Sequence, residues 1–156
     1  MIKGALTLTD DDQNEFCSAE IRWENAMDDR TVRMALERHW DASDASDFNA
    51  EHEIYHEDAV LHYPQSGEQI RGRRNIQESR IVQPNKKHFS VSRIVGSGDL
   101  WVTEFILSYD GVPSYTVSIM EFRDGLVENE TQYFADQFDP APSRAHLVER
   151  AGVLPQ

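Results

Sequence analysis

The sequence contains a single cysteine, Cys17, among its 156 residues. An internal disulfide is therefore excluded, and we take the thiol as incidental rather than catalytic. No apolar run is long enough to cross a bilayer, and the amino terminus lacks the basic and apolar regions of a signal peptide. These absences lead us to expect a cytoplasmic protein without a membrane partner.

Basic residues are scarce as well. The chain has 15 lysines and arginines against 28 aspartates and glutamates, which gives a formal net charge of −13. An acidic surface is repelled by nucleic-acid phosphates and by anionic lipids, so we expect no nucleic-acid partner. Internal repeats and low-complexity tracts are also missing from the sequence. The length fits one domain with its own apolar core.

The first half of the chain reads as helical. We expect an N-terminal extension over residues 1–28, which contains a short helix, and the folded domain over residues 29–140. Apolar residues recur at helical spacing from Val32 to Ser43. The predicted elements that follow are a helix over 48–57, a strand over 60–63, a short strand ending near 71, and a helix over 73–82.

The second half reads as strands. Four β-rich runs lie near residues 87–95, 100–109, 114–123 and 126–134, separated by turns rich in glycine and aspartate. Connections this short join only antiparallel neighbours, so the runs form a meander. Helices followed by a meander indicate an α+β fold. Residues 141–156 are expected to hold a short helix around 144–150 and a tail.

Side-chain alternation predicts which face of the sheet is covered. In the run 101–109 the odd positions are apolar or aromatic and should face the helices. The run 114–123 is apolar on both faces, because Tyr115, Val117 and Ile119 alternate with Met120 and other apolar residues. We therefore expect its second face to be buried in a homodimer.

Three segments in this order resemble the SnoaL-like and nuclear-transport-factor-2-like superfamily. They are residues 47–61, with the acidic entry into the first strand; residues 63–76, with Pro64 in the turn and Gly72 before a helix; and residues 131–138. The resemblance covers roughly residues 30–140. It implies a cone-shaped, curved, mostly antiparallel sheet packed against three helices, a conical pocket for a small apolar organic ligand, a dimer formed through the sheet, and no cofactor.

The same resemblance assigns residues to positions in the pocket. Ketosteroid isomerases of this superfamily use an aspartate base, with a tyrosine and a protonated aspartate as oxyanion donors. The matching positions here hold Tyr63, His39 and Ser118, so steroid isomerisation is not expected. The last strand points Glu130, Gln132 and Phe134 inward.

We expect His39 and Glu130 to act as an acid/base pair and Tyr63 to hold a substrate oxygen. This would support a cofactor-independent isomerase, cyclase, dehydratase or hydrolase. Alternatively, His39 and Tyr63 are ordinary core residues, and the domain is a non-catalytic binding or assembly module. Ser118 and Gln132 are predicted ligand contacts, together with an aromatic wall: Trp40, Tyr55, Trp101, Phe105 and Phe134.

A metalloprotease-like string competes with this interpretation. His52, Glu53 and His56 form H-E-x-x-H, and His62 follows at a zinc-ligand spacing. A zinc hydrolase would need glycine where Ala59 stands. Strand alternation in the resembled fold also sends His62 to the opposite face, so we expect no metal, with His52 packed in the core and His56 near the surface.

The third predicted helix carries Arg73, Arg74 and Arg80. No glycine-rich phosphate cradle accompanies them, so we expect these arginines to be solvated or paired with surface acids.

Overall fold

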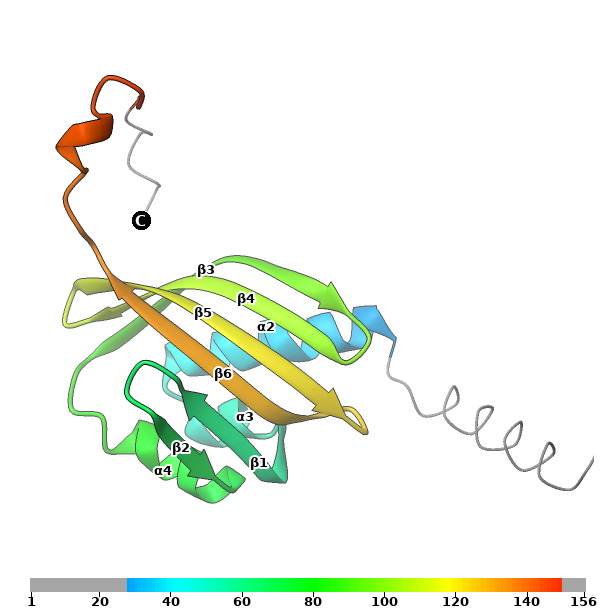
Figure 1. The fold of residues 1–156 in the computed structure, drawn as a ribbon. Coiled ribbons are helices and arrows are strands. Elements are labelled where there is room, and N and C mark those ends of the chain that lie inside the picture. Colours follow the sequence, from blue (N-terminus) through cyan, green and yellow to red (C-terminus); the bar gives the residue numbers. More distant parts are fainter. Residues whose placement is uncertain (1–27, 150–156) are drawn as a thin grey trace, which may run out of the picture.

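In the computed structural model, which describes residues 28–149, three helices cover one face of a curved six-stranded sheet (Figure 1). The predicted α+β cone-shaped fold is confirmed. In chain order the elements are α2 (Asp29–Ala45), α3 (Phe48–His52), β1 (Tyr55–Tyr63), β2 (Glu68–Arg71), α4 (Arg73–Ile81), β3 (Lys87–Ser97), β4 (Leu100–Tyr109), β5 (Val112–Arg123), β6 (Leu126–Asp136) and the 3₁₀ helix η1 (Pro142–Arg144).

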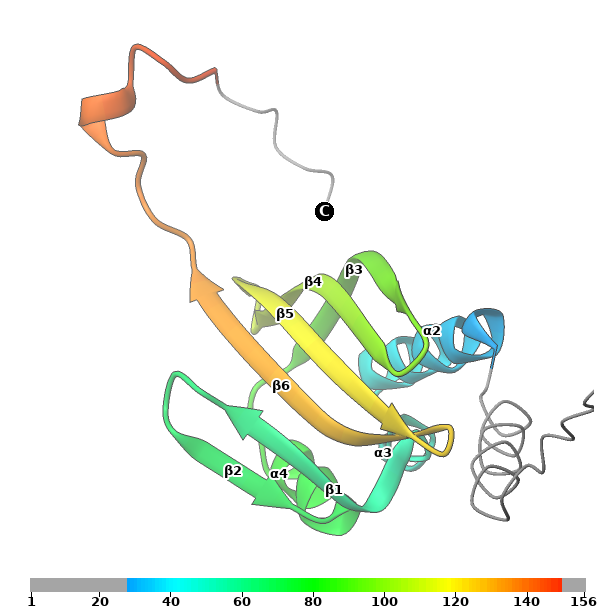
Figure 2. The same ribbon diagram turned by 45° about the vertical axis from the view of Figure 1, so that its right-hand side comes forward.

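The sheet has the strand order β2-β1-β6-β5-β4-β3 (Figure 2). Strands β3 to β6 form the predicted antiparallel meander. Strand β1 pairs in parallel with β6, which sets Leu61 opposite Glu130, and the sheet stays open with β2 and β3 at its edges. This pairing brings the first strand of the chain beside the last one and so joins the two halves of the site described below.

Helix α2 is capped at its N-terminus and packed along one face. The Asp28 side chain accepts a hydrogen bond from the backbone N–H of Thr31 at 3.0 Å, an N-cap that satisfies one of the first-turn donors. Val32, Leu36 and Trp40 share the face that is buried against the sheet. The Trp40 indole also donates to the Thr103 hydroxyl on β4 at 3.1 Å, which fixes the position of α2 along the sheet.

One predicted boundary is wrong. The helix expected over 48–57 ends at His52, and strand β1 already begins at Tyr55. Pairing with β6 explains the difference, because the Val127 N–H donates to the Ile54 carbonyl oxygen at 2.8 Å. That contact joins residues far apart in sequence, so helical spacing within residues 48–57 could not reveal it.

The predicted alternation of buried and outward-facing side chains on β4 is confirmed, and the structure shows the same alternation on β5. The odd positions of β4 from Trp101 to Leu107 are buried beneath the helices. On β5 the even positions face the same core, whereas Tyr115, Val117 and Ile119 lie on the outer face. Tyr115 is 44% exposed, so the outer face of β5 carries accessible apolar surface.

The chain after β6 runs away from the sheet (Figures 1 and 2). The helix expected over 144–150 is instead the short 3₁₀ helix η1, which has Pro142 in its first turn. The predicted helix within residues 1–28 falls almost wholly outside the described residues. Within the described part of the chain, no helix has the length and apolar character that crossing a membrane requires.

Candidate functional site

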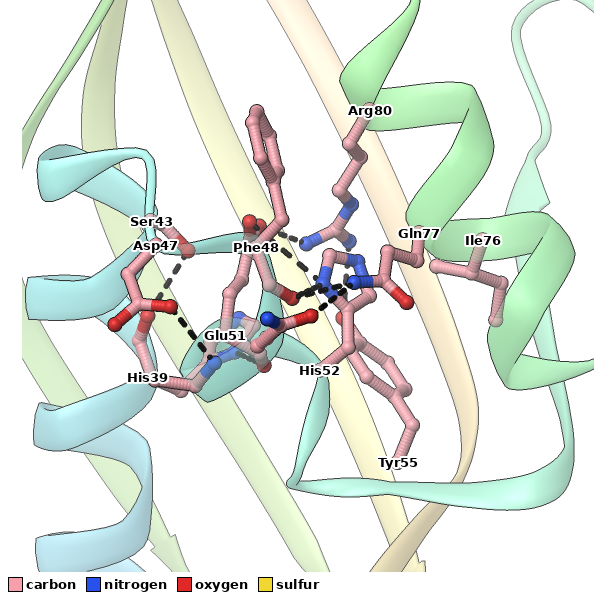
Figure 3. Close-up of polar contacts among 12 residues, drawn as sticks. His39, Ser43, Asp47, Phe48, Glu51, His52, Tyr55, Ile76, Gln77 and Arg80 are labelled. Atoms are coloured by element: carbon pink, nitrogen blue, oxygen red, sulfur yellow. Dashed lines mark hydrogen bonds and ion pairs between the residues drawn. The ribbon is translucent and has the colours of Figure 1, made fainter.

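Arg80 lies at the centre of a buried polar cluster. It follows Ile76 by one helical turn on α4, so both side chains point from the same face of the helix toward the sheet. Ile76 is fully buried, and the Arg80 side chain is only 11% exposed. Figure 3 shows the Arg80 side chain extending from α4 toward Glu51. The inward face of α4 therefore brings a permanent positive charge into the core.

Two buried carboxylates neutralise that charge. The Arg80 Nη1 donates to Glu51 Oε1 at 2.7 Å, and the Nη2 donates to Glu130 Oε2 at 2.9 Å and to the Tyr55 hydroxyl at 2.9 Å. Glu51 is 1% exposed and Glu130 is completely buried. One guanidinium thus binds carboxylates from α3 and β6 at once, and without it both would be buried without a counter-ion.

Glu130 accepts hydrogen bonds at both of its oxygens. Oε1 accepts from the Ser118 hydroxyl and from the Gln132 amide, each at 2.7 Å, and Oε2 accepts from the Tyr55 hydroxyl at 2.5 Å as well as from Arg80. Burial raises the pKa of Tyr55 well above its ordinary value, so its hydroxyl stays protonated and donates. Four donors hold Glu130 as a rigid carboxylate, which leaves little acceptor capacity for a substrate.

Burial also opposes ionisation of Glu51, because it raises the pKa of a carboxyl group. Burial is the largest single effect, but the charge and hydrogen bond of Arg80 together with smaller contributions from His39 and His52 outweigh it, so the pKa of Glu51 lies below its ordinary value. Glu51 therefore remains a carboxylate at neutral pH.

His39 is buried in its neutral form. Its Nδ1 lies 2.7 Å from the Glu51 carbonyl oxygen, which can only accept, so the ring proton sits on Nδ1. The Nε2 then carries a lone pair and has no hydrogen-bond partner among the described residues. Burial lowers the pKa of His39 to about 4, and the nearby charge of Arg80 acts in the same direction.

The histidines of the H-E-x-x-H string point in different directions. His52 packs in the core with its ring stacked on Tyr55, as predicted, and its Nδ1 bonds the Phe48 carbonyl oxygen at 2.7 Å. His56 is partly exposed and pairs with Asp58, whereas His62 bonds Gln69 on β2. Among residues 28–149, no three histidine, cysteine, aspartate or glutamate side chains are arranged to hold a metal ion.

A cavity of about 100 Å³ opens beside this cluster. It lies where α4 ends and β3 begins, next to the ends of β1, β4 and β6. Its apolar wall consists of Phe89, Leu107 and Phe134. The polar side chains that line it are Tyr63, Ser79, Arg80, Gln83, Lys87, Tyr109 and Gln132. Every one of these seven can donate a hydrogen bond, and no described aspartate or glutamate is part of the lining.

Arg80 and Gln132 connect the cavity to the cluster, since each lines the cavity and also bonds Glu130. Burial raises the pKa of Tyr63 to about 12, so the hydroxyl in the cavity is a neutral donor. The ring of Tyr63 packs on Phe134 with 5.8 Å between the ring centres. The polar part of the cavity wall therefore consists of hydrogen-bond donors and offers no carboxylate that could accept a proton from a substrate.

The predicted site residues fall into three groups. Tyr63, Gln132 and Phe134 line the cavity. His39, Tyr55, Ser118 and Glu130 belong to the buried cluster, where His39 and Glu130 make no direct hydrogen bond. The remaining members of the predicted aromatic wall lie in the apolar core rather than in the cavity lining: Trp40, Trp101 and Phe105.

The expectation that Arg80 pairs with surface acids is wrong, although Arg73 does pair with the exposed Glu57. The helical spacing of Arg80 from Ile76 was the signal that could have placed it in the core. Glu51 and Lys87 were also missed. Glu51 lies 29 residues from Arg80 in sequence, and nothing local to either residue indicates the pairing.

Comparisons with known proteins agree with the fold. The SnoaL-like domain family matches residues 36–129, more than half of the chain. A nuclear-transport-factor-2-like protein of unknown function from Burkholderia xenovorans is 53% identical, with a TM-score of 0.76, and the match covers 81% of this chain and 99% of that one. No protein with a curated description matches.

Two further solved structures are similar. A candidate ketosteroid isomerase from Kribbella flavida is 26% identical, with a TM-score of 0.75, over 82% of this chain and 96% of its own. A Mycobacterium tuberculosis epoxide hydrolase is 22% identical, with a TM-score of 0.58, over 68% of this chain and 84% of its own, and shares the fold.

The buried state of His39 predicts a pH-dependent stability. Its folded pKa of about 4 lies below the ordinary value of 6.5, so the unfolded chain binds more protons between these values. The stabilising effect is complete above pH 6.5 and is lost as the pH falls toward 4, a loss of about 3 kcal/mol in the free energy of unfolding. Urea unfolding of the wild type and His39→Gln at pH 7 and pH 4 should show a loss smaller by about that amount in the variant.

The matched control is His146→Gln, because the His146 side chain is exposed and makes no hydrogen bond or ion pair among the described residues. This control should keep the pH dependence of the wild type. Equal losses in all three proteins would contradict the buried neutral state of His39.

Proposed function

The chain belongs to the SnoaL-like domain family, and we propose that it binds a small, largely apolar organic molecule through an oxygen atom in the cavity beside Arg80. The observation that carries this proposal is the convergence of donors on a space with an apolar wall and no carboxylate. A carbonyl or similar oxygen would accept from these donors, while the rest of the molecule contacts Phe89, Leu107 and Phe134.

Tyr63 is the proposed anchor for that oxygen. Its hydroxyl has no hydrogen-bond partner among the described residues and remains protonated at neutral pH because its pKa is raised to about 12. One amide N–H of Gln132 donates to Glu130, and the second N–H can donate to a ligand. Two such donors would also stabilise negative charge that develops on a carbonyl oxygen.

Cofactor-independent acid/base catalysis is the proposed reaction class, as in isomerisation, cyclisation, dehydration or hydrolysis. The predicted pair, His39 and Glu130, lies in the cluster next to the cavity and not in its wall. Arg80 and Gln132 lie between Glu130 and the cavity, and both are hydrogen-bonded to Glu130. Ligand binding is thus the better supported part of the proposal, and catalysis by the pair stays a prediction.

The alternative function is a binding module without chemistry. The position of His39 and Glu130 outside the cavity wall favours it, because a ligand in the cavity would not touch the predicted acid/base pair. The convergent polar lining favours an enzyme. Steroid isomerisation is not part of the proposal, because Tyr63, His39 and Ser118 occupy the positions of the isomerase residues.

We also propose that the chain forms a homodimer through the outer face of the sheet. Tyr115 on β5 and Tyr133 on β6 are each 44% exposed there. Together with Ile106 and Val117 they line a hollow of about 370 Å³. Apolar side chains gathered on one sheet face are typical of a protein interface, and a second copy presents the same tyrosines in a self-complementary arrangement.

The anchor is tested with benzamide, a small aromatic carbonyl compound. In an amide NMR titration, we expect the wild-type shifts to concentrate at residues that line the cavity. Tyr63→Phe should weaken binding about fivefold, because one hydrogen bond contributes about 1 kcal/mol. Tyr115→Phe, on the outer face, is the matched control and should bind like the wild type. Shifts confined to the outer face, or none at all, would contradict the proposal.

The dimer is tested by light scattering during gel filtration. The wild type should have twice the 17.9 kDa mass of the chain. Tyr115→Glu places a charge in the proposed interface and should give the single-chain mass, while Val112→Glu, at an exposed position before the hollow, should stay dimeric. A wild type of single-chain mass at high micromolar concentration would rule the dimer out.

A further inference from the structure

Lys87 is the one lysine in the cavity wall. It opens strand β3 and is half-buried, in contrast to its exposed neighbour Lys86. In this acidic chain, the described residues place no aspartate or glutamate within ion-pair distance of the Lys87 ammonium. Lys87 therefore lines a donor-rich cavity without an acidic partner among the described residues.

The contacts of Lys87 are compatible with a neutral amine. Its Nζ donates to the Arg80 carbonyl oxygen at 3.2 Å, which requires only one N–H. The same nitrogen lies 5.2 Å from the centre of the Phe48 ring. Burial lowers the pKa of Lys87; Glu51 opposes that change and the positive charge of Arg80 adds to it. The lowered pKa increases the fraction of Lys87 that is present as the nucleophilic amine at neutral pH.

We propose that Lys87 captures the carbonyl carbon of a small aldehyde or ketone as an imine in this cavity. The proposal rests on the proposed function, since the ligand must enter the same space and bring a carbonyl oxygen to the donors around Tyr63. It adds a substrate class and a nucleophile to that function. The neighbouring apolar wall suits a carbonyl compound with an aromatic or aliphatic body.

The step is balanced without any further reactant. The Lys87 amine adds to the carbonyl carbon, the nitrogen loses a proton, and the carbonyl oxygen gains one to become the hydroxyl of a carbinolamine. That hydroxyl then leaves as water after a second proton transfer, while the nitrogen lone pair forms the C=N bond. The second N–H proton departs from nitrogen, so one water is released per imine and hydrolysis reverses the step.

Tyr63 is suited to assist the departure of water. Its neutral hydroxyl lines the same cavity and can donate a hydrogen bond to the leaving oxygen. Arg80 is already bound to Glu51 and Glu130, so it acts as a fixed charge rather than as a proton donor. Tyr63 is therefore the proposed donor to the leaving oxygen, and Arg80 supplies a fixed positive charge.

The experiment is reductive trapping on the full chain. Protein at pH 7.5 is incubated with benzaldehyde and sodium cyanoborohydride, which reduces an imine to a stable secondary amine, and the labelled lysine is mapped by peptide mass spectrometry. The chain makes the assay specific, because its lysines are only Lys3, Lys86 and Lys87. We expect Lys87 to be labelled at least tenfold faster than Lys86, and excess benzamide to slow labelling at Lys87 alone.

Two variants serve as controls. Lys87→Arg keeps the charge but cannot form an imine, so the fast labelling should disappear while the unfolding midpoint stays close to that of the wild type. Lys86→Arg should leave the fast labelling intact. Equal, slow labelling of all three lysines would overturn the inference.

The failure of this inference is distinguishable from failure of the proposed function. Slow labelling together with benzamide shifts at the cavity residues would overturn the imine and leave the binding site standing. Slow labelling without any benzamide binding would overturn both.

Discussion

The burial of one guanidinium between two carboxylates is the interaction on which the site depends. Arg80 binds Glu51 on α3 and Glu130 on β6, with the Tyr55 hydroxyl of β1 as a third partner. Burying a charge is costly unless it is paired and hydrogen-bonded. The pairing therefore constrains four elements at once, because α4, α3, β1 and β6 take their relative positions around a single side chain.

The same pairing determines the character of the cavity. Because Arg80 and Gln132 both bind Glu130 on their inner side, the carboxylate is kept out of the cavity and the wall presents donors instead. Burial lowers the pKa of Lys87, which favours its neutral form. The proposed donors to a carbonyl oxygen and the proposed amine for a carbonyl carbon then belong to one electrostatic arrangement.

Local patterns in the sequence predicted the fold well, because the alternation in β4 and the turn residues of the meander act between neighbours. The same patterns could not reveal contacts between residues far apart in the sequence. The early start of β1 depends on β6, and the inward position of Arg80 depends on carboxylates 29 and 50 residues away. The resemblance predicted Tyr63, Gln132 and Phe134 as site residues, and these three side chains line the cavity. Lys87 belongs to no motif, and only the packed structure shows its surroundings.

The most direct test is the free energy of unfolding of Arg80→Met at pH 7. The account predicts a loss of about 3–5 kcal/mol, because two buried carboxylates lose their counter-ion. Adding Glu51→Gln and Glu130→Gln should restore most of that loss, which separates the charge effect from simple misfolding. Arg73→Met, which removes an exposed ion pair with Glu57, should change the stability by less than about 0.5 kcal/mol. An Arg80→Met protein as stable as the wild type would contradict the account.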